Sequence, residues 1–142
     1  MRLTSALVGL TLFALTATTA SADVIQQRKA KFKEIGGAAK ASSQLLRGSF
    51  DAAAAKKHMD LIAANAVAVA KLFPEGSGQG DTTAGPKIWS DWKNFEAGLM
   101  KLKTDAEAAS AAAGKGQKAF AAAFGVAVRN CKECHQTYRV KR

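Results

Sequence analysis

The residues of this chain best suited to chemistry are two cysteines and a histidine near the C-terminus, in the run Cys131-Lys132-Glu133-Cys134-His135. Both cysteines of the sequence fall in this run. Helix positions three and four residues apart share a face, so the two thiols and the imidazole would project together. C-x-x-C-H is the attachment pattern of c-type haem, in which each thiol adds to a haem vinyl group. The run therefore predicts one covalent haem c, held by Cys131 and Cys134, with His135 as the axial ligand of the iron.

Three other interpretations of the same residues carry less weight. A disulfide between Cys131 and Cys134 would close a very short loop and stabilise little. A thioredoxin-like redox pair requires a βαβ setting, of which the sequence shows no sign. A zinc site requires four ligands, and beyond these residues only the distant His58 remains.

The segments that must position this run are helical. Apolar residues recur at steps of three and four, and no segment alternates with period two. Proline and glycine divide the chain into four predicted helices, with Ser49 or Asp51 as N-cap of the second and Pro86 as first residue of the third. They cover roughly residues 24–47, 51–73, 86–113 and 117–140. The predicted fold is all-α, an antiparallel up-and-down four-helix bundle enclosing the haem.

The loop at residues 74–86 and the many alanines bear on the same prediction. This loop holds both prolines and is long for a bundle connection, and such loops often border a functional site. Alanine favours helix but fills little volume, so a haem between the helices would supply apolar bulk. Small side chains could also simply allow closer helix packing.

The first 22 residues have the layout of a secretory signal peptide. Arg2 precedes a ten-residue apolar run at residues 6–15, and Ala20-Ser21-Ala22 forms a small-residue cleavage site. The run is too short to span a bilayer, which disfavours a retained anchor. The sequence thus predicts a leader at 1–22, a domain at 23–142, and export to the periplasm without membrane attachment.

The formal net charge of +10 raises the question of an anionic partner. The lysines are spread over every segment rather than forming a stripe, and export removes the usual nucleic-acid partners. We therefore expect no nucleic-acid binding and interpret the surplus as general solvation, with some steering toward an anionic partner.

Three pieces of sequence together resemble cytochrome c prime, the class II c-type cytochromes. They are Arg28 with Phe32 in the first predicted helix, Pro86-Lys87-Ile88-Trp89 at the start of the third, and residues 131–139 (CKECHQTYR) in the fourth. The resemblance covers essentially the whole chain after the leader.

The resemblance implies that Phe32 stands over the iron on its distal side. A methionine at the equivalent place binds iron in low-spin relatives, whereas phenylalanine cannot. The implied centre is five-coordinate and high-spin, with an apolar distal pocket that accepts carbon monoxide and nitric oxide more readily than dioxygen. Nitric oxide could also displace His135 and bind on the proximal side.

The resemblance also assigns four polar residues. Arg28, Lys29 and, more loosely, Thr83 match positions that approach the haem propionates. Arg139 matches an arginine beside the axial histidine, where its fixed charge influences the imidazole.

Two functions remain open from the sequence. The first is a one-electron haem protein that binds small gases. The second is a low-spin electron carrier with a side chain such as Met59 as sixth ligand. Met100 and His58 are further candidates, although the methionines have core spacing and His58 has charged neighbours. Enzymatic activity of a peroxidase type is disfavoured, because nothing beyond Arg139 would supply a general acid or base near the iron. Redox proteins, NO and CO are the expected partners.

The resemblance further suggests a homodimer paired through the first two helices. An exposed apolar strip around Val24, Leu45 and Val67 would suit such pairing.

Overall fold

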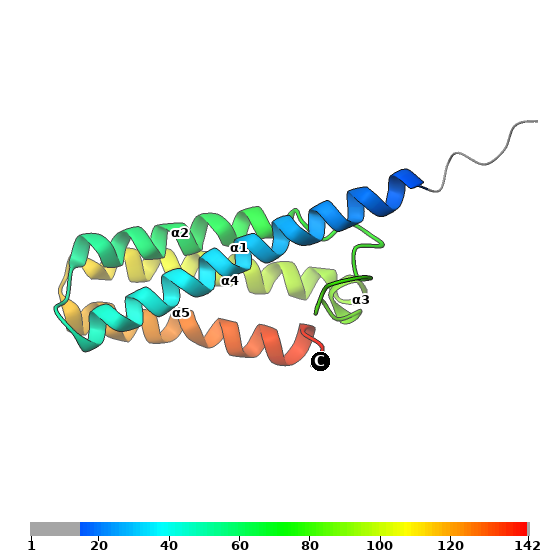
Figure 1. The fold of residues 1–142 in the computed structure, drawn as a ribbon. Coiled ribbons are helices and arrows are strands. Elements are labelled where there is room, and N and C mark those ends of the chain that lie inside the picture. Colours follow the sequence, from blue (N-terminus) through cyan, green and yellow to red (C-terminus); the bar gives the residue numbers. More distant parts are fainter. Residues whose placement is uncertain (1–14, 142) are drawn as a thin grey trace, which may run out of the picture.

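The computed structural model describes residues 15–141, with side chains from residue 21 onward. This range contains five α-helices and no β-strand: α1 (Leu15–Arg47), α2 (Ala52–Ala70), α3 (Lys87–Ser90), α4 (Trp92–Ala113) and α5 (Gln117–Tyr138). The four long helices form the predicted antiparallel up-and-down bundle (Figure 1). None of the helices in this range has both the length and the apolar character needed to cross a membrane.

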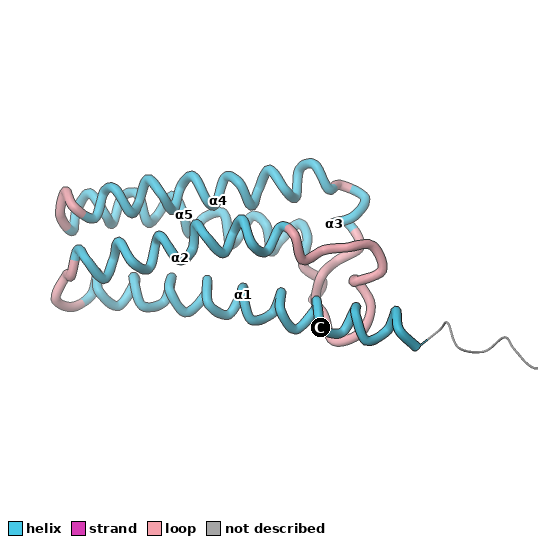
Figure 2. Tube along the Cα trace, turned by 90° about the horizontal axis from the view of Figure 1, so that it is seen from above, coloured by secondary structure: helices cyan, strands magenta, loops and turns pink. Residues whose placement is uncertain are grey.

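Helices that follow one another in the chain pack side by side: α1 on α2, α2 on α4, and α4 on α5. The fourth side of the bundle is different, because α1 and α5 meet at few positions. Figure 1 shows α1 crossing obliquely, close to α5 at one end and away from it toward α3. Figure 2 shows the long loop, α3 and the C-terminus gathered at that open end.

Two local signals mark where helices begin. Of the two predicted N-caps of α2, the structure uses Asp51, whose Oδ1 accepts a 3.0 Å hydrogen bond from the amide of Ala54. Gly116 precedes α5 with φ of 99°, a conformation that favours glycine.

The first helix begins earlier than the sequence pattern predicts. It was expected from about Val24 but starts at Leu15, because the intervening residues include neither proline nor glycine. Residues 1–14 of the expected leader lie outside the described residues, and cleavage after Ala22 stays a prediction.

The third predicted helix is in fact two. Asp91 adopts φ −132° and ψ 39°, which breaks the helical path between α3 and α4. Its carboxylate accepts hydrogen bonds from the Tyr138 hydroxyl (2.9 Å) and the Asn94 amide (2.7 Å). Pro86 lies one position before α3 rather than inside it. The second and fourth helices also end two or three residues early, at Ala70 and Tyr138.

The core has two parts. One lies toward the α1–α2 connection and includes Met59, Ile62, Leu102 and Phe120. The other lies toward the long loop and includes Phe73, Ile88, Phe95 and Leu99. Phe32 packs against both. The predicted buried face of the second helix is confirmed by the burial of Met59, Ile62, Ala66, Val69 and Phe73.

The apolar strip expected on the first two helices is not exposed. Val24, Leu45 and Val67 are half-buried, because Leu45 packs against the core and the others lie on helix flanks. Leu61 is the large apolar side chain that α2 exposes, at 37%. A dimer stays a prediction, without this strip to carry it.

Candidate cofactor site

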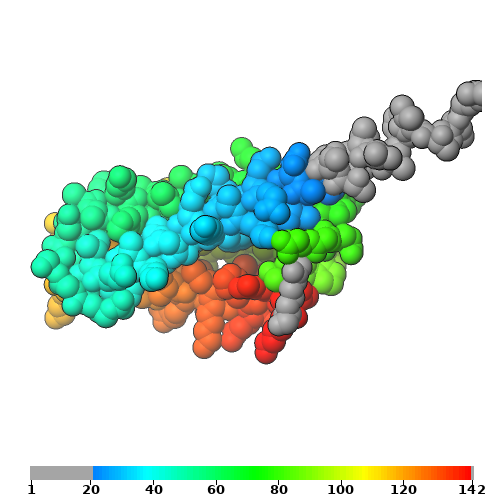
Figure 3. Space-filling model, viewed as in Figure 1, coloured from blue at the N-terminus to red at the C-terminus, as the bar shows by residue number. Residues whose placement is uncertain are grey.

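A cavity of about 1050 Å³ lies between α1 and α5, with α4 and the loop around residues 81–84 completing its wall. Figure 3 shows the hollow between the blue-to-cyan atoms of α1 and the orange-to-red atoms of α5. Much of its wall is apolar, and includes Ile35, Phe73, Ile88, Phe95, Leu99 and Val128. All eight predicted site residues line it: Arg28, Lys29, Phe32, Thr83, Cys131, Cys134, His135 and Arg139.

The last turns of α5 bring the three residues of the motif to this wall. Their spacing of three and four residues places Cys131, Cys134 and His135 on one side of the helix. The two cysteines are free thiols rather than a disulfide. Burial raises the pKa of both, and the neighbouring Cys131 raises that of Cys134 further, so both are protonated at neutral pH.

His135 is held in its neutral form. Burial lowers the pKa of its imidazole, and the positive charge of Arg139 lowers it further. A neutral imidazole has a free nitrogen lone pair, which is what an iron ligand requires. Arg139 is thus near enough to His135 to act on the imidazole through its charge.

Arg28 is a buried cation, with only 3% of its surface exposed. Its Nη1 donates to the carbonyl of Leu72 (3.1 Å) and to Ser77 Oγ (3.2 Å), and its Nη2 to the carbonyl of Ser77 (2.8 Å) and Thr82 Oγ1 (2.9 Å). The guanidinium also lies 4.4 Å from the ring centroid of Phe73. Within residues 15–141 it forms no ion pair with an acidic side chain, so a buried positive charge faces the cavity.

Lys29 and Thr83 stand at the mouth of the cavity, each tied to a neighbour. Lys29 forms an ion pair with Asp81 of the loop. Thr83 Oγ1 accepts a 3.2 Å hydrogen bond from Nε of Arg139. Thr83, which the resemblance assigned to the propionates, is thus in direct contact with Arg139, which the resemblance placed beside the axial histidine.

Backbone pairing closes this end of the cavity. The amide of Gly85 donates to the Tyr138 carbonyl (2.7 Å), and that of Val140 to the Thr83 carbonyl (3.0 Å). The pairs flank an antiparallel bridge between Ala84 and Arg139. The loop is therefore joined to the segment that follows the motif.

The side chains available as a second axial ligand are few. Met59 is fully buried in the core and does not line the cavity. Neither Met100 nor His58 lines it, and His58 Nδ1 lies 3.3 Å from Ser42 Oγ instead. Among the residues described, His135 is the one histidine in the cavity wall, and no methionine reaches it.

These features fit a haem c. The cavity is at the upper end of the range of about 300–1,000 Å³ typical of ligand pockets. It offers two thiols and a neutral imidazole on one wall and a buried unpaired cation at its end. A bare metal ion is a poorer match, because no three His, Cys, Asp or Glu side chains of the described range converge on one point.

Comparison with known proteins decides the family. Residues 23–139 match the sequence profile described as Cytochrome C'. The chain belongs to the cytochrome c' family. This family consists of haem proteins and implies a covalently bound haem c at the Cys-x-x-Cys-His run.

Named relatives cover most of the chain. A cytochrome c' of Rhodopseudomonas palustris is 38% identical over 141 residues, or 96% of this chain and 94% of the relative. A cytochrome c-556 of Agrobacterium fabrum is 38% identical over 124 residues, or 86% and 84%. The solved structure of cytochrome c' from R. palustris has a TM-score of 0.80, covering 84% of this chain and 98% of its own.

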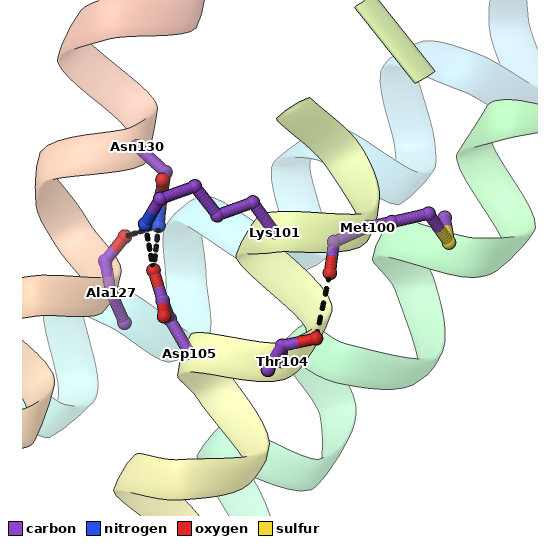
Figure 4. A network of polar contacts seen from close by, with 6 residues as sticks. All are labelled: Met100, Lys101, Thr104, Asp105, Ala127 and Asn130. Atoms are coloured by element: carbon purple, nitrogen blue, oxygen red, sulfur yellow. Dashed lines mark hydrogen bonds and ion pairs between the residues drawn. The ribbon is translucent and has the colours of Figure 1, made fainter. Parts of the chain in front are cut away.

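One residue of the site was not predicted from the sequence. Asn130, which precedes Cys131, lines the cavity and donates from Nδ2 to Asp105 Oδ2 (2.8 Å) and the Ala127 carbonyl (3.1 Å). Lys101 pairs with the same carboxylate at 2.5 Å (Figure 4). An asparagine on the otherwise apolar face of the fourth helix was the signal that could have identified this contact.

Proposed function

We propose that this cytochrome c' family member is a periplasmic haem protein with a five-coordinate, high-spin iron. It carries single electrons and binds small gases. The observation that carries the proposal is the composition of the cavity wall. It has one imidazole on the α5 side and, on the α1 side, the phenyl ring of Phe32 without a methionine or second histidine.

In this proposal the motif residues hold the cofactor. The thiols of Cys131 and Cys134 would each add across a vinyl group, with the sulfur bonding to one vinyl carbon and the hydrogen to the other. His135 binds the iron through its neutral imidazole. When bound, the haem supplies an iron that takes up or releases one electron and can bind a diatomic ligand.

Phe32 determines which gases bind in the distal pocket. Its ring lies near that of Phe73, with centroids 6.5 Å apart, and offers no hydrogen-bond donor. Bound dioxygen requires such a donor more than carbon monoxide or nitric oxide does. A solved relative, a mutant of cytochrome c prime from Alcaligenes xylosoxidans, is a nitric oxide complex at 25% identity and a TM-score of 0.77. We propose that this protein also binds nitric oxide.

The propionates of the haem are the anions we assign to the buried end of the cavity. Arg28 compensates their charge mainly through its position, because both of its Nη atoms already donate to protein oxygens. Lys29 and Thr83, which the resemblance assigns to the same propionates, stand at the mouth of the cavity instead. Arg139 keeps its proton and acts on His135 only through its charge, and we assign no side chain a general acid or base role. We therefore propose a carrier and gas-binding protein rather than an enzyme.

The optical spectrum of the holoprotein tests the proposal. We expect a high-spin ferric spectrum and a ferrous form that takes up carbon monoxide. A low-spin, six-coordinate ferric spectrum, together with a ferrous form that does not take up carbon monoxide, would support the electron carrier with a sixth side-chain ligand instead. His135→Ala should alter the ferric spectrum while Cys131 and Cys134 retain the haem, and an unaltered spectrum would refute the axial assignment.

A further inference from the structure

Five exposed cations border the mouth of the cavity. Lys29, Lys33 and Lys40 are separated by four and seven residues, so they follow one strip of α1. Lys132 lies on α5, and Arg139 follows the C-terminal end of that helix in an extended conformation. Lys29, Lys33 and Arg139 line the cavity, and Lys40 and Lys132 lie on the helices beside it. We call these five residues the cationic rim.

The rim is poorly compensated by acidic side chains. Asp81 pairs with Lys29 and is the one acid among the described residues that line the cavity. Lys33, Lys40 and Lys132 form no ion pair within residues 15–141. Two haem propionates would offset only part of this charge, since Arg28 already faces them from the buried end.

Several lysines elsewhere on the bundle have acidic partners. On α4, three lysines accompany three acidic residues, and Lys101 and Lys103 pair with Asp105 and Glu107. On α2, Lys56 pairs with Asp60. Lys57 of α2 and Lys93 of α4 form no ion pair in the described range either, so what distinguishes the rim is its position on both sides of the cavity, whose described wall holds one acid, Asp81.

We propose that the cationic rim is the docking surface for an acidic one-electron redox protein. This inference rests on the proposed function, because it places the partner where electrons would enter or leave the haem. Opposite charges on the two surfaces would steer the encounter and orient the partner over the mouth. A lipid surface supplies no electron, so a protein partner fits the proposed one-electron function better than a membrane.

Reduction kinetics of the ferric holoprotein test this surface. The probe is a reduced flavodoxin, a small acidic protein that gives one electron to the ferric iron and makes it ferrous. We expect the second-order rate constant to fall steeply as salt rises from about 10 mM to about 500 mM, because screening shortens the reach of the charges. Lys33→Glu/Lys132→Glu should slow the low-salt reaction by about tenfold or more.

The matched control is Lys57→Glu/Lys93→Glu, which makes the same change in net charge with exposed lysines of α2 and α4 that form no ion pair. We expect it to slow the reaction by less than about twofold. Equal slowing by both double variants, or a rate of the wild type that does not depend on salt, would overturn the proposal. Both double variants should keep the wild-type spectrum and carbon monoxide binding, so a failure of the proposed function would be seen separately.

Sedimentation with phosphatidylglycerol vesicles separates a membrane from a protein partner. We expect the holoprotein to show no greater loss of vesicle binding in Lys33→Glu/Lys132→Glu than in the control variant. Rim-dependent vesicle binding combined with unchanged flavodoxin kinetics would assign the rim to a lipid surface and contradict the proposal.

Discussion

Asn130 Nδ2 donates a 2.8 Å hydrogen bond to Oδ2 of Asp105. This contact ties α5 to α4 one residue before the first cysteine of the motif. Lys101 contributes most to lowering the pKa of the Asp105 carboxyl, and Asn130 contributes next. The carboxylate is thus stabilised in its charged form between the helices (Figure 4).

Asp105 should make the stability of the bundle depend on pH. Its folded-state pKa lies below the unfolded value of about 3.9, so the unfolded chain binds the proton more readily. The stabilisation of the folded state by the Asp105 carboxylate is therefore complete above about pH 5 and is lost as the pH falls through the folded-state pKa. Asp105→Asn should lower the free energy of unfolding by about 1 kcal/mol at pH 6 and flatten its decline toward pH 3, measured by urea denaturation. Glu107→Gln, which removes an exposed pair with Lys103, is the control and should leave the pH profile unchanged.

Phe32→Ala should open the distal side of the haem. Removing the ring takes away the side chain that an incoming ligand must displace, so carbon monoxide association should accelerate about tenfold or more, which corresponds to about 1.4 kcal/mol in the barrier. Flash photolysis of the ferrous holoprotein measures this rate. Phe50→Ala removes a ring that packs on Phe120, away from the cavity, and should not change the rate. Identical kinetics in the two variants would show that Phe32 does not cover the iron.

Arg28→Met should loosen the loop at residues 74–86. The substitution keeps most of the apolar stem but removes four hydrogen bonds to the loop and its flanks. Their loss should lower the free energy of unfolding by about 2 kcal/mol or more. Limited proteolysis should then cut within the loop faster than in the wild type. Lys31→Met, which removes an exposed pair with Glu34, should leave the cleavage rate unchanged. A loop equally resistant in both variants would contradict the role assigned to Arg28.

Gly85→Ala should disrupt the join between the loop and the C-terminal segment. A Cβ at this position would lie 2.8 Å from the carbonyl oxygen of Tyr138, a backbone atom that cannot move aside without breaking the bridge. We expect a lower Tm. Gly37→Ala places a Cβ in open space within α1 and should raise stability by up to about 1 kcal/mol through helix propensity. Thermal unfolding followed by circular dichroism distinguishes the two, and equal Tm values would refute the crowding at Gly85.

The sequence predicted the bundle because helical periodicity is a local property. The apolar face of α2 and the cap at Asp51 follow from residues a few positions apart, and the structure has both. The break at Asp91 was not predictable in this way. Its carboxylate accepts from Tyr138, which lies 47 residues later, and no local pattern reports that contact.

The site residues, too, were predictable where they depend on local sequence and not where they depend on long-range contacts. Cys131, Cys134 and His135 were predicted from spacing alone, because one helix carries all three. The hydrogen bonds of Arg28 to Ser77 and Thr82 depend on the path of a long loop, which residue type does not determine. The cationic rim was missed for a similar reason, since its residues come together only once α1 and α5 lie on either side of the cavity.

The near-separation of α1 and α5 has a consequence for how the chain folds. Each of the other three helix–helix interfaces is formed by two long helices that are consecutive in the chain. Most contacts therefore have short sequence separation. Folds with such low contact order assemble quickly, in microseconds to milliseconds. The first and last long helices meet at few positions, and the cavity separates them. We therefore expect the cofactor to join the two ends of an already formed bundle, as the final closure of the fold rather than its nucleus.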